Sequence, residues 1–297
     1  YVPVRCGAVF DDRSPRGLLG DNTGDNISEK RMTFCEFTVQ YWAWKNVRAD
    51  YYGLCHYRRY LSFAEKRYPV NEHHMVHLKV LLPQDKRRYG FLNAKKMENL
   101  ISQYDIVTSE PAPVCNIPTP LGPQKTVRKM WEAHDGLFFE KKAIDLMFDL
   151  IDTLAPEYSR SARAYFAGGY HRGYNCYVMR KELFDRLCRL QFPILFEVER
   201  RLDMSNYSAG MKRTPGYIGE MLYGIFLYHV ITCEHRKVKE LQLLFIDDVE
   251  QPKNFPALVK KQVRYGGERL VRARIDPCFP LGSRQRDALK KMLRRGG

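Results

Sequence analysis

The sequence predicts an α/β fold. Short apolar runs of strand length alternate with longer stretches of helical periodicity, which favours a sheet flanked by helices over a helical bundle or a β-sandwich. Hydrophobic residues make up 44% of the 297 positions, enough for a large core, and exclude a disordered chain. No apolar run approaches the roughly 18 residues of a membrane-spanning helix. In such a fold we expect ligands at the carboxyl ends of the strands.

The first elements alternate as this fold requires. Val4–Phe10 is predicted to be a strand, with Gly7 at a point where another group can approach the backbone closely. Ser28 is a suitable N-cap for a partly buried helix that runs to Asn46. Tyr51–Cys55 is an apolar strand whose end turns abruptly cationic. Further strands are predicted at Leu78–Leu82 and Tyr104–Thr108.

The second half continues the alternation after an irregular connection over residues 111–123, which holds five prolines. Periodicity predicts helix Lys141–Leu154, strand Tyr174–Met179, helices Lys181–Leu190 and Phe192–Leu202, and a helix from Thr214 to about Val230. Pro193 is expected in the first turn of its helix, where proline is tolerated.

Positive charge is concentrated at the C-terminal end. The formal net charge is +15, and residues 253–297 hold 13 Lys and Arg against three Asp and Glu. Within this basic tail, Arg284–Arg295 sets apolar residues at helical spacing among cations, which suits either the surface of an anionic membrane or a solvated, partly disordered tail. Nucleic acid is not expected as a partner, because the sequence has no zinc-finger spacing, RNP motif or helix-turn-helix pattern.

Eight cysteines are spread along the chain without a C-x-x-C pair. Zinc and dithiol redox chemistry are therefore not expected. Cys55, Cys176 and Cys188 lie within apolar runs, where a reduced cysteine behaves as a small hydrophobic residue. The pattern favours a cytoplasmic protein, with any membrane contact peripheral and on the inner face of the cytoplasmic membrane.

A polar loop between the first strand and the first helix is a candidate for ligand binding. Gly20–Ser28 holds two Gly together with Asp21, Asp25 and Asn26, whose side chains can bind a pyrimidine edge or ribose hydroxyls. The alternative is a turn with Asx caps. Walker A and G-x-G-x-x-G motifs are both missing, which disfavours an ordinary NTPase or dehydrogenase.

The segment His56-Tyr57-Arg58-Arg59-Tyr60 is the sharper signal. Two consecutive arginines at the end of a strand cannot both be buried without partners, because an unpaired buried guanidinium is very costly. Guanidinium groups match phosphate oxygens in a bidentate way, and His56 can donate a proton or act as a base, so a diphosphate is a natural ligand. The alternative is an internal ion pair with Asp or Glu.

Six motifs occur in order along the chain: Y-x-P-V-x-C-G-A at 1–8, G-D-x-x-G-D-N-I-S-x-K at 20–30, C-E-F-T-x-x-Y-W-A-W-K-N at 35–46, Y-G-L-C-H-Y-R-R-Y at 52–60, N-C-Y-V-M at 175–179 and L-Q-F-P-I-L-F-E-V-E at 190–199. Together they resemble the capsular and O-antigen polysaccharide biosynthesis proteins grouped with galactofuranosyltransferases of the GT-A type. The likeness covers about residues 1–232. It departs at Arg31, where asparagine is expected, and the tail matches nothing.

The resemblance implies a GT-A-like fold with a central mixed sheet over residues 1–252, followed by the basic tail 253–297. Residues 1–110 would form a nucleotide half and residues 111–252 an acceptor half. The implied activity is transfer of a sugar, with galactofuranose favoured, from a UDP-sugar to a growing surface polysaccharide or lipid-linked glycan. The tail would hold the chain beside an anionic membrane or a partner glycosyltransferase. Neither donor sugar nor linkage follows.

In GT-A folds a main strand usually ends in Asp-x-Asp, which holds a divalent metal against the diphosphate. The corresponding strand here ends in His56-Tyr57-Arg58, so we expect Arg58, with Arg59 or His56, to replace the metal and stabilise the UDP leaving group. No cofactor is then required. A metal held by Asp21, Asp25 or Asp105 is the alternative. The predicted donor-binding residues are Gly7, Asp21, Asp25, Asn26, His56, Arg58 and Arg59.

If transfer inverts the anomeric centre, one carboxylate has to take the proton of the acceptor hydroxyl. Glu220 is the first candidate, because Pro215 and Gly216 place it near a helix entrance. Glu197, Glu199 and Asp135 are alternatives, and any of the four can equally be an ordinary ion-paired carboxylate. The predicted acceptor-binding residues are His134, His171 and Asn175. The rival functions are a non-catalytic glycan-binding or scaffold module of a polysaccharide assembly complex, and a nucleotide hydrolase.

Overall fold

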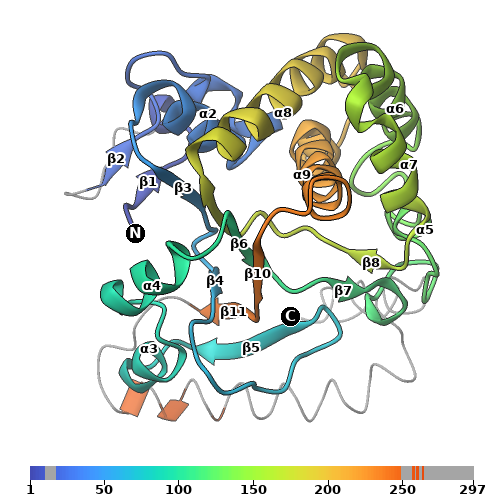
Figure 1. Cartoon of the computed structure of the whole chain (residues 1–297). Coiled ribbons are helices and arrows are strands. Elements are labelled where there is room, and N and C mark those ends of the chain that lie inside the picture. Colours follow the sequence, from blue (N-terminus) through green and yellow to red (C-terminus); the bar gives the residue numbers. More distant parts are fainter. Residues whose placement is uncertain (11–17, 249–255, 258, 261–262, 264–297) are drawn as a thin grey trace.

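The structure is a computed structural model that describes residues 1–10, 18–248, 256–257, 259–260 and 263. In this part of the chain the strands form mixed sheets, and helices flank them (Figure 1). The predicted mixed α/β fold is therefore confirmed. All but five positions of the basic tail 253–297, and the whole of its segment Arg284–Arg295, lie outside the described residues.

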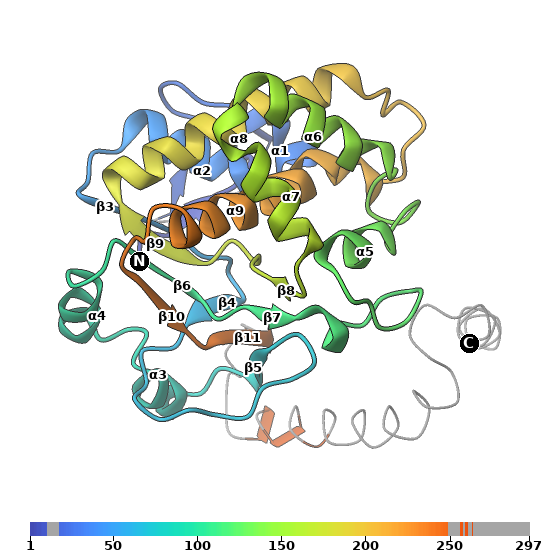
Figure 2. The ribbon, with the colours of Figure 1, turned by 45° about the vertical axis from the view of Figure 1, so that its right-hand side comes forward.

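The helices cover both sides of the strands. They are α1 (Arg31–Phe34), α2 (Phe37–Asn46), α3 (Pro83–Tyr89), α4 (Ala94–Ile101), α5 (Val127–Glu132), α6 (Lys142–Leu154), α7 (Ser159–Ala167), α8 (Lys181–Arg201) and α9 (Thr214–Thr232). Helices α2 and α6 to α9 lie on one side, while α3 and α4 lie on the other, as Figure 1 and Figure 2 show.

The strands form two larger sheets and two short pairs. They are β1 (Val4–Arg5), β2 (Leu19–Gly20), β3 (Tyr51–Leu54), β4 (Arg59–Leu61), β5 (Met75–Val80), β6 (Ile106–Ser109), β7 (Ala112–Pro113), β8 (Tyr170–His171), β9 (Tyr177–Arg180), β10 (Val238–Leu241) and β11 (Leu243–Asp248). The larger sheets have the orders β10-β6-β9-β3 and β4-β11-β5, and each mixes parallel and antiparallel pairs. Both contain strands from each side of residue 110.

Helix α9 is the central helix of the core. It packs against α1, α7 and α8, and Ile218, Leu222 and Phe226 along it are fully buried. A helix that is apolar on every face has to lie inside the molecule. The buried hydroxyl of Tyr223 shares a 2.6 Å hydrogen bond with Thr108 of β6. The helix is thereby fixed against the four-stranded sheet.

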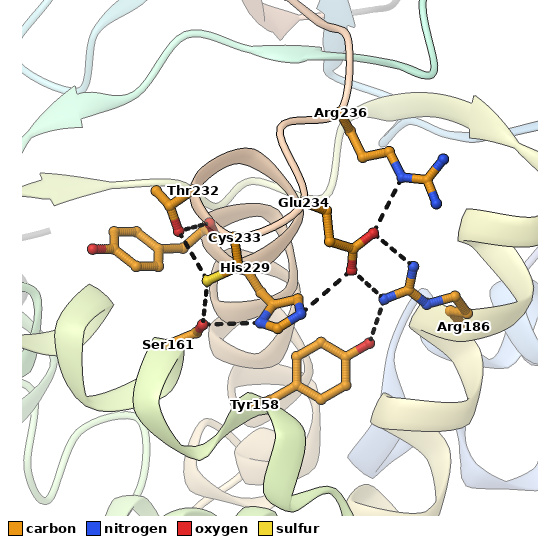
Figure 3. Close-up of polar contacts among 9 residues, drawn as sticks. Tyr158, Ser161, Arg186, His229, Thr232, Cys233, Glu234 and Arg236 are labelled. Atoms are coloured by element: carbon orange, nitrogen blue, oxygen red, sulfur yellow. Dashed lines mark hydrogen bonds and ion pairs between the residues drawn. The ribbon is translucent and has the colours of Figure 1, made fainter.

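A polar cluster ties the C-terminal end of α9 to α7 and α8 (Figure 3). Glu234 accepts hydrogen bonds of 2.5 and 3.0 Å from Arg186 and one of 3.1 Å from Arg236. His229 Nε2 lies 3.3 Å from the same carboxylate, and His229 Nδ1 lies 2.9 Å from Ser161 Oγ. The Arg186 guanidinium, against the effect of burial and with help from Arg236, lowers the pKa of Glu234 to about 2.

The predicted strand Val4–Phe10 is mostly wrong. Strand β1 ends at Arg5, and residues Ala8–Phe10 form a 3-10 helix. The cause is Asp21, whose carboxylate accepts the backbone N–H groups of residues 7 and 8 at 2.8 Å and curls this segment away from extended geometry.

The predicted helix from Ser28 to Asn46 is interrupted. Cys35 has a φ of 52°, which ends α1 and lets α2 begin in a new direction. Ser28 does not cap the helix as predicted, because its hydroxyl donates a 2.5 Å hydrogen bond to Asp21 instead.

Two predictions about strands and helices further along also need correction. Helix α8 runs without a break through Pro193, which was expected to start a second helix. Buried side chains on both sides of the proline, including Phe192 and Ile194, hold the helix together although one backbone hydrogen bond is lost. Arg59 does not lie at the tip of β3, because β3 ends at Leu54 and Arg59 opens β4. Strands β10 and β11 are additions to the predicted elements.

Helices α6 and α9 begin within one residue of their predicted starts. No helix within the described ranges is long and apolar enough to cross a membrane. The seven cysteines in the same ranges are free thiols.

Candidate functional site

Two arginines without an acidic partner lie where the chain passes from β3 into β4. Arg58 and Arg59 are half-buried, and neither forms an ion pair with Asp or Glu among the described residues. The Nε–H of each is buried without a hydrogen-bond partner. Their guanidinium groups lie on aromatic rings, 5.2 Å from the centroid of Phe245 and 5.3 Å from that of Tyr174. Their donors are therefore available to an anion.

His56 lies beside these cations and is neutral at physiological pH. Burial, together with the charges of Arg59, Arg58 and Arg213, lowers its pKa to about 4. Burial is the largest cause of the shift, and the charges of the three arginines add to it. Arg58 and Arg59 follow His56 in the chain, and Arg213 ends the 3-10 turn Met211–Arg213 before α9. An anion bound here would balance these positive charges.

Glu220, in the second turn of α9, is a carboxylate whose charge interacts with that of Arg59. Its Oε1 accepts the backbone N–H of Tyr174 at 3.0 Å and lies 3.5 Å from His171 Nε2. Burial alone would raise the pKa of Glu220, but His171, the charge of Arg59 and the Tyr174 amide together lower it. The side chain is 15% exposed. It is therefore an ionised carboxylate at the edge of the core, five residues after Pro215 in the first turn of the helix.

The contact between His171 and Glu220 requires glycine at position 173. A Cβ added to Gly173 would lie 2.2 Å from His171 Nε2 and 2.7 Å from Glu220 Oε1. His171, predicted to be an acceptor-binding residue, is buried, and its ring contacts Glu220. The β8–β9 connection is thus shaped around the carboxylate.

A second group of polar residues joins the site, and sequence reasoning named Asn175 in it but missed Glu36 and Arg213. Glu36 follows the break at Cys35, and its Oε1 accepts a 3.1 Å hydrogen bond from Asn175 Nδ2. Arg213 donates a 3.1 Å hydrogen bond from Nε to Cys35 Sγ. Burial disfavours the charge of Arg213, but Cys35, Tyr217 and Glu36 raise its pKa. These residues meet only because the chain turns at Cys35.

Flat side chains form a stack that includes Tyr217, three residues before Glu220 on α9. The His134 and Phe138 rings are 4.6 Å apart and 6° from parallel, and Phe138 and Tyr217 are 4.7 Å apart and 14° from parallel. The Arg213 guanidinium lies 5.5 Å from the Tyr217 centroid. Burial lowers the pKa of His134, which keeps its ring neutral. Sequence reasoning named His134 but not Phe138 and Tyr217, which resemble ordinary core residues.

The Gly20–Ser28 loop is built around one buried acid. Asp21 is fully buried, and its two oxygens accept hydrogen bonds from Gly7, Ala8, Ser28 and Thr38. Asp21 therefore organises the backbone of the loop, and its oxygens are occupied by the protein itself.

The other predicted donor-binding residues of this region either lie at the surface or are covered by another side chain. Asn26 accepts the backbone N–H of Ser28, in an Asx turn, and Asp25 is exposed and accepts a 3.2 Å hydrogen bond from Tyr41. Gly7, with a φ of 64°, does have a group close to its backbone. That group is the side chain of Arg31, whose Cδ would lie 2.1 Å from an added Cβ.

The remaining candidate bases are engaged elsewhere. Glu197 is bound by Arg200 and Arg201, which lower its pKa to about 2. Glu199 binds Lys30 at 2.7 Å, and Asp135 accepts the backbone N–H of Lys141 at 2.7 Å. None of the three shares a hydrogen bond with Glu220 within the described ranges, so the structure does not bring them into the site.

No group of three or more His, Cys, Asp or Glu that could hold a metal ion occurs in the described part of the chain. Asp105, the third acid considered as a ligand, binds Arg180 Nε and the backbone N–H of Lys237, both at 3.0 Å. The acids Asp21, Asp25 and Asp105 therefore do not converge on one point.

Fold and site together define a mixed α/β protein with an uncompensated cationic site next to an ionised carboxylate. A model of the domain of unknown function DUF4422 matches residues 1–231, and the chain therefore belongs to this family. A search of curated proteins found no match.

Among solved structures, the fold is similar to that of WbbM, described as a bifunctional glycosyltransferase in its apo form. The TM-score is 0.75 and the sequence identity is 29%. The match covers 86% of this chain and 43% of the WbbM chain, so the present chain spans less than half of that relative.

Proposed function

We propose that this chain is a glycosyltransferase that takes its sugar from a UDP-sugar. The observation that carries the proposal is that two half-buried arginines, Arg58 and Arg59, form no ion pair with Asp or Glu among the described residues. The ionised Glu220 belongs to the same site. An anion with several oxygens is the ligand that such a site needs for charge balance. The similarity to WbbM, a bifunctional glycosyltransferase, supports a sugar nucleotide as that anion.

In the proposed reaction the diphosphate lies on Arg58 and Arg59. The bond between the anomeric carbon of the sugar and the diphosphate oxygen breaks, and fixed guanidinium groups stabilise the charge that develops on UDP. They take the role that a divalent metal has in many phosphate sites. Among UDP-sugars, UDP-galactofuranose is the first candidate donor, because the proteins that the six motifs resemble are grouped with galactofuranosyltransferases.

Glu220 is the proposed general base of an inverting transfer. It takes the proton of an acceptor hydroxyl while that oxygen forms the new bond to the anomeric carbon. Its lowered pKa supports this role, since a base has to be ionised before it accepts a proton. His171 is then a positioning residue that fixes the carboxylate.

The acceptor is proposed to lie against the ring stack of His134, Phe138 and Tyr217, because aromatic faces suit the C–H surfaces of sugars. We expect it to be a growing surface polysaccharide or a lipid-linked glycan. The basic tail, which lies mostly outside the described residues, would keep the chain on the inner face of the cytoplasmic membrane or beside a partner enzyme.

UDP binding tests the proposal directly. UDP at 100 times its Kd should raise the melting temperature of the wild type by about 5 °C. Arg58→Ala and Arg59→Ala should lose this rise. Arg189→Ala is the matched control, because Arg189 is exposed on α8 and pairs with Asp185.

The outcomes separate the rival functions. A wild type that ignores UDP would favour the glycan-binding scaffold module, and a full rise in both site variants would place the diphosphate elsewhere. A nucleotide hydrolase would release free sugar at full rate without an acceptor.

A further inference from the structure

Glu36 is a carboxylate without an assigned role that lies inside the candidate site. It is half-buried, and it forms no ion pair with Lys, Arg or His in the described ranges. Within these ranges, the carboxylate of Glu36 takes part in one hydrogen bond, which Asn175 Nδ2 donates to Oε1. A carboxylate has room for several donors, so most of its hydrogen-bonding capacity is unused.

The side chain of Asn175 also has unused hydrogen-bonding capacity. Its side chain is 2% exposed, and its Oδ1 is buried without a hydrogen-bond partner. Leaving a buried amide oxygen unsatisfied costs about 1–3 kcal/mol, so a native site normally provides a donor for it. Protein groups do not provide it here, and a ligand hydroxyl can.

The backbone around these two residues is held in unfavourable conformations. Positive φ angles occur at Cys35, Tyr174 and Asn175, at 52°, 72° and 44°. Such strain persists only where the surrounding structure enforces it, and it gathers at functional sites. Tyr174 binds Glu220 through its backbone N–H, and the next residue binds Glu36 through its side chain. One strained connection therefore fixes two carboxylates.

The contacts of Arg59 and Arg213 indicate which part of a ligand would contact Glu36. The Arg59 guanidinium lies 5.3 Å from the centroid of the Tyr174 ring, and the next residue, Asn175, donates the hydrogen bond to Glu36. Arg213 donates a hydrogen bond to Sγ of Cys35, the chain neighbour of Glu36. Glu36 thus lies on the side of the site where the diphosphate is proposed to bind. The group next to a diphosphate in a sugar nucleotide is the sugar that will be transferred.

We propose that Glu36, Asn175 and Arg213 bind the hydroxyl groups of the donor sugar. The inference rests on the proposed function, since it requires a sugar nucleotide on Arg58 and Arg59. Glu36 and Asn175 Oδ1 accept hydrogen bonds from sugar hydroxyls, and the Arg213 guanidinium donates one to a hydroxyl oxygen. Asn175, predicted on the acceptor side, moves to the donor side. The chemical class that this subsite selects is a hexose with free vicinal hydroxyls.

The test compares UDP with two UDP-sugars by calorimetry, without an acceptor. The probes are UDP, UDP-galactofuranose and UDP-galactopyranose. In Glu36→Gln the affinity for the preferred UDP-sugar, relative to that for UDP, should fall about tenfold or more, because a charge-assisted hydrogen bond is lost. The affinity for UDP itself should stay within about twofold. Glu199→Gln is the matched control, since Glu199 binds Lys30 and Thr33.

A second variant protects the test against misfolding. Asn175→Gly keeps the backbone conformation that a φ of 44° requires while removing the side chain, and it should lower the same affinity ratio. An unchanged ratio in both variants, with UDP still bound, overturns the inference and leaves the proposed function intact. A wild type that binds neither UDP nor a UDP-sugar overturns both.

Discussion

At the scale of single residues, Glu220 illustrates how a partly buried carboxylate is kept ionised. Taking the group out of water favours its neutral form, and the Tyr174 amide, His171 and the charge of Arg59 reverse that preference. His171 and the Tyr174 amide come from the β8–β9 segment, and Arg59 comes from the start of β4. The charge state of Glu220 is therefore a property of the folded site and not of the helix that carries it.

Replacing Glu220 with glutamine should lower kcat by about 10²- to 10⁴-fold, because the amide cannot accept the acceptor proton. UDP binding should be unaffected. Turnover with a defined glycan acceptor, followed by mass spectrometry, measures the effect. Glu197→Gln, at the exposed pair with Arg200 and Arg201, should keep normal activity. Near-normal turnover of Glu220→Gln would assign the base to another carboxylate.

The sequence predicts some site residues and misses others for identifiable reasons. Arg58 and Arg59 are found because two adjacent cations after an apolar strand have no place in a core. Asp21 is found but belongs to the loop itself, since sequence cannot tell a carboxylate that binds ligand from one that binds backbone. Glu36 and Arg213 are missed because they are 177 positions apart, and only the turn at Cys35 brings them together.

At the scale of helices and strands, burial patterns predict the positions of helices correctly, whereas single residues that usually break a helix do not predict where helices end. The apolar spacing of α6 and α9 places both helices well, since burial of one face or of all faces decides where such helices lie. Pro193 suggests a break in α8 that tertiary packing overrides. The left-handed Cys35 interrupts a helix that no glycine or proline marks. Local rules describe what a segment prefers alone, and neighbours change the outcome.

The cluster around Glu234 gives a prediction for the helical layer. Glu234→Gln should lower the free energy of unfolding by about 1–3 kcal/mol, because charge-assisted hydrogen bonds from Arg186 and Arg236 become neutral ones. Urea unfolding at pH 7 measures the difference. Glu157→Gln, an exposed acid at the start of the same helical region, should change the free energy of unfolding by less than about 0.5 kcal/mol.

The difference in stability between the wild type and Glu234→Gln should also depend on pH. The pKa of Glu234 falls from 4.5 to about 2 on folding, so its contribution is complete above pH 4.5 and is lost as the pH falls toward 2. The difference in stability between wild type and Glu234→Gln should therefore shrink as the pH is lowered from 5 to 3. A difference that stays constant over this range would show that the charge of Glu234 does not stabilise the fold.

At the scale of the whole molecule, the sheets join distant parts of the sequence. Strand β10 pairs with β6, and β11 lies between β4 and β5. The family match ends at residue 231, before either strand begins. Alternation of strands and helices was enough to predict the α/β class, but pairing partners depend on long-range contacts that a single sequence does not reveal.

The metal dependence of the proposed transfer is tested on the whole protein. Because cationic side chains are proposed to hold the diphosphate, transfer should continue at an undiminished rate in excess EDTA. The assay is turnover with a UDP-sugar and acceptor, before and after chelation. Complete loss of activity that manganese restores would show that a divalent ion, and not Arg58 and Arg59, stabilises the leaving group.

The central place of β11 has a consequence for how the protein matures. Strand β4 begins with Arg59, and its partner in the sheet is made almost two hundred residues later, at 243–248. A nascent chain lacks this partner until residues 243–248 have been synthesised. We therefore expect that a chain truncated before residue 243 cannot complete the sheet that holds Arg59, although all six motifs are already present in it.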